Sequence, residues 1–282
     1  MPPATAQILI VIRDQSERVA RVADEILARL TAQAEWEVVG VVTTDQIDSR
    51  AEFSLVVAVG GDGTILRTCR QLGQWQRPVI GINLGRLGFL TDLSPDEFLQ
   101  RLPEIARGDY QIASHLMFSC RHRHADGSVE THLGLNEVAL LAGGSLQLLE
   151  VELSIDGERV TSFRGDGLLI STPVGSTAHS LAAGGPILRQ DLEAFVVTPV
   201  CPHALTDRPL VDGAECTYTL RAPTAHPGVM LVVDGQIKTP FANADVAEIR
   251  RADVSFQLVR LRGHSYYNML HRKLGWAGHP NG

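Results

Sequence analysis

The sequence is poor in the features that mark several large classes of protein. Its four cysteines are far apart and form no C-x-x-C pair, which argues against a zinc site or a disulfide framework. No apolar stretch reaches the roughly 20 residues that a transmembrane helix needs. The N-terminus lacks a basic segment followed by a long apolar run, so we expect no secretory signal. These absences favour a cytoplasmic protein.

Positive charge is also limited. The chain has 32 acidic residues against 25 lysines and arginines, a net charge of −7, and so no general basic field for nucleic acid or an anionic membrane. We therefore expect neither of these partners. Hydrophobic residues make up 44% of the chain and charged residues 20%, and 282 residues suffice for two domains with cores of their own.

The first part of the chain alternates strand and helix patterns. Helical spacing of apolar residues after Ser16 and again from residue 64 to 72 predicts helices between buried strands. The apolar runs that predict these strands are residues 7–12, 36–42, 55–59 and 78–84. Such alternation predicts an α/β domain with a parallel sheet, which binds ligands at the C-terminal ends of its strands.

The pattern changes near residue 113. Short strand-like segments then alternate with Asp-Gly pairs, which favour hairpins because they tolerate positive φ. We predict an α/β domain over residues 1–112 and a mostly β, layered or sandwich-like domain over residues 113–262. A tail over residues 263–282 is predicted to return to the N-terminal domain as an amphipathic helix. Its apolar residues are Tyr266, Tyr267, Leu270, Leu274 and Trp276.

A glycine-rich turn follows the strand predicted at residues 55–59. It consists of Gly60, Gly61, Asp62, Gly63 and Thr64 and leads into a helix. Glycines let backbone N–H groups approach a phosphate, and the helix dipole favours its charge, so the turn predicts an anion site. A carboxylate repels phosphate, so Asp62 is expected to serve metal ligation, proton removal or turn formation. The turn is neither a P-loop nor the G-x-G-x-x-G fingerprint.

Two later segments are also rich in glycine. Residues 81–92 follow a predicted strand and form either an ordinary βα loop or a floor for the same ligand, with Phe89 as its apolar surface. Residues 164–186 combine two glycine pairs with serine and threonine hydroxyls, which suit the oxygens of a ribose.

Taken together, these motifs resemble those of the NAD kinase family. The GGDGT turn alone is similar to that of NAD kinases, of diacylglycerol and sphingosine kinases, and more distantly of 6-phosphofructokinases. The remaining motifs occur in NAD kinase order, and the resemblance extends from residue 54 to the tail. They are GINLGRLGFLTD at 81–92, Asn-Glu at 136–137, GDGLLISTPVGSTAHSLAAGGP at 165–186, TPVCPH at 198–203 and DGQ at 234–236.

The resemblance implies transfer of the γ-phosphoryl group of ATP, or of polyphosphate, to the 2′-hydroxyl of the adenosine ribose of NAD, giving NADP. It also implies a divalent metal, usually Mg²⁺, whose ligands stay unknown, and a homodimer or homotetramer. Asp62 would orient and help deprotonate the 2′-hydroxyl, while the glycines and Thr64 would hold phosphate. The other expected nucleotide contacts are Arg67, Leu87, Phe89, Asn136, Glu137, Arg164, Asp166, Thr177, Ala178, His179, Ser180, Leu181, Ala182 and Gln236.

Two of these residues carry a more specific expectation. Where the family usually has a tyrosine that is expected to stack near adenine, this chain has His179, whose imidazole covers less area. Glu137 accepts hydrogen bonds only when ionised, which suits a ribose hydroxyl or the adenine amino group.

The remaining histidines are predicted to be surface or strand residues, because no carboxylate or cysteine is spaced with them for a metal site. Among them are His115, His122, His124 and His132.

Two rival functions stay open from the sequence. One is a lipid kinase of the GGDGT type, which the lack of an evident membrane-facing segment disfavours. The other is a non-catalytic dinucleotide sensor on the same fold, which the presence of Asp62 disfavours.

Overall fold

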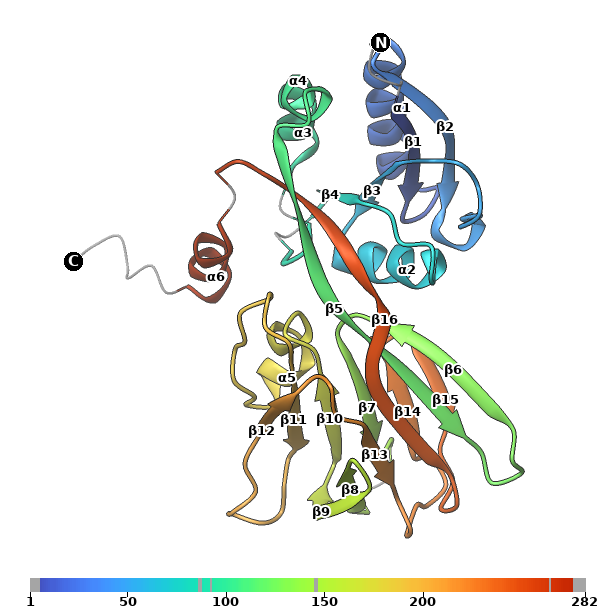
Figure 1. The fold of residues 1–282 in the computed structure, drawn as a ribbon, viewed down its shortest axis with the longest axis vertical. Helices are drawn as coiled ribbons and strands as arrows, with labels where there is room; N and C mark the ends of the chain where they lie inside the picture. Colours follow the sequence, from blue (N-terminus) through green and yellow to red (C-terminus); the bar gives the residue numbers. More distant parts are fainter. Residues whose placement is uncertain (1–5, 86–87, 92, 145–146, 264, 276–282) are drawn as a thin grey trace, which may run out of the picture. The chain divides into compact units, whose positions relative to one another are not determined.

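The structure is a computed structural model that describes residues 6–85, 88–91, 93–144, 147–263 and 265–275 (Figure 1). Leu87 and Trp276, named above, lie outside the described residues. By its internal contacts the chain divides into two compact units, Met1–Ser114 with Phe256–Gly282, and His115–Ser255.

The first unit is built on a parallel sheet with strand order β2-β1-β3-β4, which the end of β16 (Val246–Leu261) joins beside β4. All six residues of β3 are buried, as expected for a central strand covered on both faces. The parallel pairing of neighbouring strands confirms the prediction of an α/β domain with a parallel sheet. The strands are β1 (Ala6–Ile12), β2 (Trp36–Thr43), β3 (Leu55–Gly60) and β4 (Val79–Asn83).

Helices with one apolar face cover this sheet. In α1 the buried residues are Val19, Ala23, Ile26 and Leu30, whose spacing of three and four places them on one side of the helix. They belong to the same buried cluster as Ile10, Val57 and other strand residues. The helices are α1 (Glu17–Thr31), α2 (Asp62–Leu72), α3 (Pro95–Gln100), α4 (Leu102–Ala106) and the 3₁₀ turn η1 (Thr44–Gln46).

The tail forms helix α6 (Tyr266–Leu274) in the first unit. Met269 and Leu270 are its buried residues, and the Lys273 ammonium lies 5.0 Å from the centroid of the Phe89 ring. The predicted apolar face was too large, because Tyr267 is 58% exposed. The buried face of α6 is therefore narrow and centred on Met269 and Leu270.

The second unit is mostly β, as predicted. One of its sheets is antiparallel throughout, with the strand order β12-β11-β10-β7-β14-β15. Its strands are β7 (Glu137–Leu141), β10 (Gly167–Ser171), β11 (Ala194–Val200), β12 (Leu210–Gly213), β14 (Met230–Val233) and β15 (Ile237–Pro240).

A second group of antiparallel strands completes this unit, and alternate residues of both groups form one core that includes Leu140, Phe195, Leu153 and Tyr218. Its strands are β5 (Tyr110–Arg123), β6 (Val129–Gly134), β8 (Leu149–Ile155), β9 (Glu158–Gly165), β13 (Tyr218–Arg221) and the first part of β16, and β5 and β16 each run from one unit into the other. Two short helical segments, η2 (Gly175–Thr177) and α5 (His179–Ala182), follow β10.

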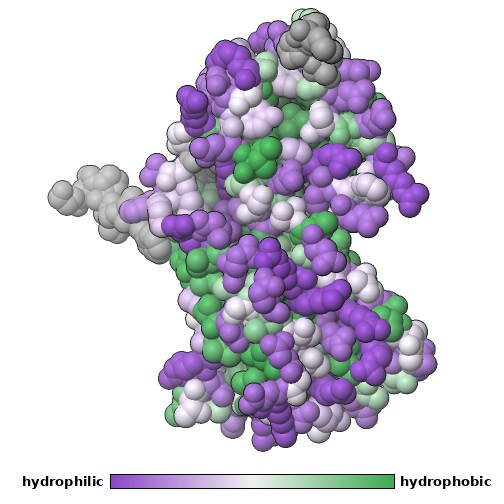
Figure 2. Space-filling view, viewed as in Figure 1, coloured by the Kyte–Doolittle hydropathy of each residue, from purple (hydrophilic) through white to green (hydrophobic). Residues whose placement is uncertain are grey.

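The surface in view in Figure 2 mixes hydrophilic and hydrophobic residues in both units. Across the described part of the chain, helices are too short or too polar to cross a membrane.

Candidate active site

The GGDGT turn is the junction between β3 and α2. β3 ends at Gly60, and α2 begins at Asp62. A Cβ atom at Gly60 would lie 2.1 Å from the Oγ1 atom of Thr64, so the chain has no room for a side chain there. The backbone N–H of Gly61 donates to Oγ1 of Thr64 at 3.4 Å. The positive end of the α2 dipole thus lies at this turn, where glycines leave the backbone N–H groups uncovered by side chains.

The Asp62 carboxylate is bound by the second glycine-rich loop. Its Oδ2 atom accepts the backbone N–H of Phe89 at 2.7 Å, and Oδ1 accepts those of Leu90 at 3.1 Å and Thr91 at 3.0 Å. Oδ1 also accepts the Thr91 hydroxyl at 2.9 Å. A Cβ atom at Gly88 would lie 1.9 Å from Oδ1, so only glycine allows this approach. Each carboxylate oxygen has about two acceptor sites, so Oδ1 is fully occupied by its three bonds, while Oδ2 keeps one site.

The structure thereby brings together two loops that the sequence separates by about 20 residues. Phe89 is half-buried, and the Arg260 guanidinium donates to its carbonyl oxygen at 3.3 Å. Arg67 and Gly63 are exposed on the first turns of α2. A ligand contact for Phe89 and Arg67 stays a prediction.

In the second unit, Asp234 organises the Asn-Glu pair. Its Oδ1 atom accepts the backbone N–H groups of Leu135 at 3.2 Å, Asn136 at 2.8 Å and Glu137 at 3.2 Å. Asp234 itself has φ of 50° and donates its N–H to the carbonyl of Glu137 at 2.9 Å. Asp234 was not among the predicted site residues, although its place in the DGQ motif was a signal.

The carboxyl group of Glu137 is buried, and few hydrogen bonds offset the cost of removing it from water. Glu137 is 5% exposed, and its Oε2 atom has no hydrogen-bond partner among the residues that the structure describes. Burial, and next the carboxylate of Asp234, raises the pKa of Glu137 to about 8. At neutral pH the side chain is therefore mostly a neutral acid that both donates and accepts. The ionised, acceptor-only side chain expected from the sequence therefore differs from the protonated acid found in this buried position.

The long glycine and hydroxyl segment packs against the same pair. The backbone N–H of Thr172 donates to the carbonyl of Asn136 at 2.9 Å. A Cβ atom at Gly175 would lie 2.0 Å from that oxygen, which requires glycine at this position. The motifs at 136–137, 165–186 and 234–236 therefore form one constellation in the second unit.

Within residues 177–182, side chains differ in what they can offer a ligand. The Thr177 hydroxyl donates to the carbonyl of Val174 at 2.9 Å, and the buried Ser180 hydroxyl lies 2.8 Å from that of Thr198. These hydroxyls hold the loop in shape. His179 and Ala182 are exposed, and Ala178 and Leu181 are half-buried.

The last three predicted contacts lie at the surface of this unit. Arg164 and Asp166 are exposed, and Gln236 is half-buried. A hydrogen bond to the Asp166 carboxylate raises the pKa of the Cys201 thiol. Their roles toward a ligand stay predictions.

Comparison with known proteins places these motifs in a family. The ATP-NAD kinase N-terminal domain matches residues 31–110, and the ATP-NAD kinase C-terminal domain matches residues 135–261. The NAD kinase of Rhodopirellula baltica is 46% identical over 230 residues, which are 82% of this chain and 74% of that protein. The NAD kinase of Azoarcus sp. is 40% identical over 240 residues, 85% of this chain and 81% of that protein.

Solved structures share the fold. An NAD kinase from Archaeoglobus fulgidus in complex with ATP superposes with a TM-score of 0.77 at 28% identity, covering 96% of this chain and all of that one. Yeast NADH kinase complexed with NADH has a TM-score of 0.88 at 22% identity, covering 99% and 93% of the two chains, and shares the fold. With both of its domain families matched in order, this chain belongs to the ATP-NAD kinase family.

Proposed function

We propose that this chain transfers the γ-phosphoryl group of ATP to the 2′-hydroxyl of the adenosine ribose of NAD, giving NADP. Membership of the ATP-NAD kinase family supports the reaction. The observation that carries it is the β3–α2 junction, where a glycine-lined helix N-terminus adjoins the Asp62 carboxylate. Phosphoryl transfer asks a protein mainly for positioning and charge stabilisation, and this junction offers N–H groups for phosphate beside an acceptor for a hydroxyl proton.

We infer that the substrate hydroxyl replaces one of the four groups bound to Asp62. Three of them are backbone N–H groups, which leave only if the loop moves. The Thr91 hydroxyl can leave by rotation about one side-chain bond. The 2′-hydroxyl would then donate to Oδ1, and the carboxylate would orient it and receive its proton as the phosphoryl group transfers.

The nucleotides would be held by both groups of motifs. Gly60, Gly61, Gly63 and Thr64 would hold phosphate, with Arg67, Phe89 and Leu87 nearby in the chain. Asn136 and Glu137 would hold adenine or ribose, and Asp166 the nicotinamide side. The further proposed contacts are Arg164, Gln236 and the segment Thr177, Ala178, His179, Ser180, Leu181 and Ala182.

For a divalent metal, Mg²⁺ in our proposal, the Asp62 carboxylate has at most one position left, on Oδ2, because three protein groups already bind Oδ1 and one binds Oδ2. Mg²⁺ usually binds through substrate phosphates and water with few protein ligands. We propose that it enters with ATP. The steps derived above for Asp62 and Thr91 do not depend on it.

Several finer points rest on the family resemblance. Polyphosphate is an alternative donor, NADH is an alternative acceptor, and a homodimer or homotetramer in the cytoplasm is the proposed state. The lipid kinase and sensor alternatives differ from an NAD kinase in their products, so the same assay separates them.

The test is to incubate the purified chain with ATP, Mg²⁺ and NAD and to quantify NADP with an NADP-specific dehydrogenase. Parallel reactions replace ATP by polyphosphate, NAD by NADH, or NAD by diacylglycerol in detergent micelles. We expect NADP to form with ATP and NAD. Phosphorylation of the lipid alone, or nucleotide binding without any product, would refute the proposal.

A further inference from the structure

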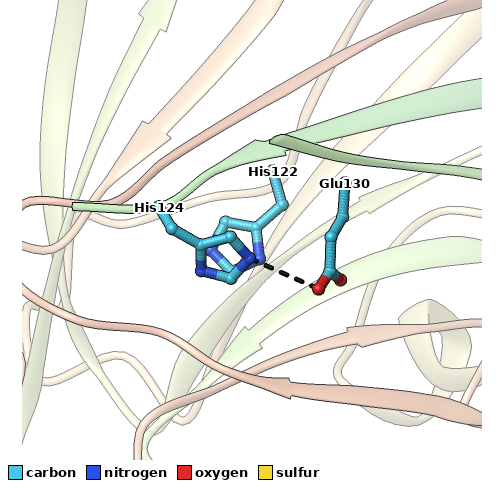
Figure 3. Close-up of side chains that lie close together, drawn as sticks. All are labelled: His122, His124 and Glu130. Atoms are coloured by element: carbon cyan, nitrogen blue, oxygen red, sulfur yellow. Dashed lines mark ion pairs between the residues drawn. The ribbon is translucent and has the colours of Figure 1, made fainter. Parts of the chain in front are cut away.

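A group of imidazoles and carboxylates lies in the second unit, at the end of the β5–β6 hairpin (Figure 3). His122 and His124 are two residues apart, a spacing that puts their side chains on one face of an extended chain. Glu130 pairs with His122 across the antiparallel ladder. One potential ligand atom from each residue lies within 4.8 Å of the others, and the described residues contain no second such set of three.

His122 is already arranged as a metal ligand would be. Its Nε2 atom lies 2.9 Å from Oδ2 of Asp245, and both side chains are buried. Asp245 also accepts the backbone N–H groups of Ala125 at 2.8 Å and Ala242 at 3.0 Å, which keeps it ionised and acceptor-only. Nε2 of His122 must therefore carry the proton, and Nδ1 has the lone pair. That Nδ1 atom is buried, and within the described part of the chain it has no hydrogen-bond partner.

A second side chain packs against the His122 ring. The Phe241 ring stacks on it with a centroid distance of 5.1 Å and an interplanar angle of 15°. A histidine whose one nitrogen donates to a carboxylate while the other is free as a ligand is the usual arrangement around protein-bound zinc.

The side chains of His124 and Glu130 are exposed enough to rotate toward a bound ion. The His124 side chain is 22% exposed, and its Nε2 atom lies 3.6 Å from Oε1 of Glu130. Glu130 is 48% exposed, and its Oε2 atom lies 3.3 Å from Nε2 of His132. Ligand atoms around tetrahedral zinc lie about 3.4 Å apart, given bonds of about 2.1 Å, so small rotations suffice.

We propose that His122, His124 and Glu130 bind one zinc-type transition-metal ion, while Asp245 orients the His122 ring through the hydrogen bond to Nε2. Imidazole nitrogen favours Zn²⁺ over Mg²⁺, so this site is distinct from one for the metal that accompanies ATP. His132 or water would take the fourth position. The ion would tie the β5–β6 hairpin to the segment before β16, and so stabilise the second unit.

The test is calorimetric titration of Zn²⁺ into the full-length chain, stripped of metal, free of any histidine tag and without nucleotide. We expect one Zn²⁺ per chain, and at least about tenfold weaker binding in His124→Ala and in Glu130→Gln. Both positions are partly exposed, so these variants should fold. Glu158→Gln, an exposed glutamate of the same unit, serves as the matched control and should bind as the wild type does.

A second readout is independent of affinity. Zn²⁺ should raise the melting temperature of the wild type and of Glu158→Gln, and raise that of His124→Ala much less. Co²⁺ should give the strong visible bands of a four-coordinate ion in the wild type alone. Absence of stoichiometric Zn²⁺ binding, or equal affinity in wild type, His124→Ala and Glu130→Gln, would overturn the proposal.

Discussion

The Oδ2 atom of Asp62 accepts the backbone N–H of Phe89 at 2.7 Å, across 27 residues of sequence. This bond and its neighbours at Leu90 and Thr91 make the acidic residue of the GGDGT turn the anchor of the second glycine-rich loop. A residue that the family resemblance implies to act on substrate therefore also holds the shape of the second glycine-rich loop. Substitutions here must separate these two roles.

Asp62→Asn should lower turnover by about 10²–10⁴-fold, the usual effect of losing a general base. The amide also turns one acceptor into a donor that faces backbone N–H groups, so the loop at 88–91 should loosen. Thr91→Val keeps the carboxylate and its three backbone bonds and removes only the hydroxyl, so its turnover should stay within about threefold of wild type. Steady-state kinetics on both variants checks this, and equal losses would mean that the hydrogen bond from the Thr91 hydroxyl, and not proton transfer to the carboxylate, limits the rate.

Glu137→Gln should change how stability depends on pH. The pKa of Glu137 is about 8 in the folded chain, against an ordinary 4.5, so the folded state holds a proton that the unfolded state has lost. Below pH 4.5 Glu137 is protonated in both states and does not change the free energy of unfolding. Between pH 4.5 and 8 that free energy falls as pH rises, by about 1.4 kcal/mol per pH unit. The glutamine variant lacks this loss.

We expect wild type and Glu137→Gln to have similar urea midpoints at pH 5, and the variant to be more stable at pH 8.5 by a few kcal/mol. Glu158→Gln, at an exposed position, should follow the wild type at both values. Parallel pH profiles for wild type and Glu137→Gln would show that the buried acid is not protonated.

Leu270→Ala should destabilise the first unit by about 2–5 kcal/mol, because this leucine of α6 is 3% exposed and truncation leaves a cavity. Tyr267→Ala, on the same helix but 58% exposed, should change stability by less than about 0.5 kcal/mol. Thermal unfolding of both variants measures the contrast. Similar melting temperatures in the two would mean that α6 contributes no packing.

His179→Tyr should bind NAD several-fold more tightly than the wild type, because a phenol ring offers more stacking area, worth about 0.5–1.5 kcal/mol. His179→Ala should bind it more weakly. His179 is exposed in the free protein, so neither change should alter folding. Calorimetric titration of NAD, with His226→Ala as a histidine control, tests this, and identical dissociation constants would place His179 outside the nucleotide contacts.

Local pattern was sufficient for the outline of this protein. Apolar runs and helical spacing predicted the parallel sheet around β3, and Asp-Gly pairs predicted a mostly β second half, because burial and turn conformation act over a few residues at a time. The motif order predicted the family. The turn at Asp156-Gly157 is an example: its φ values of 50° and 83° are the positive values that an Asp-Gly pair tolerates, so the pair alone predicts the turn.

Only the tertiary structure decided the chemical state of the individual groups. Spacing along the chain predicted no carboxylate partner for the histidines. The structure brings Glu130 beside His122 through hairpin register and Asp245 from 123 residues away. The four bonds to Asp62 and the protonation of Glu137 likewise depend on distant segments. Electrostatic interactions, hydrogen bonds and metal coordination depend on distances of a few ångströms in space, and the number of residues between two groups does not predict those distances.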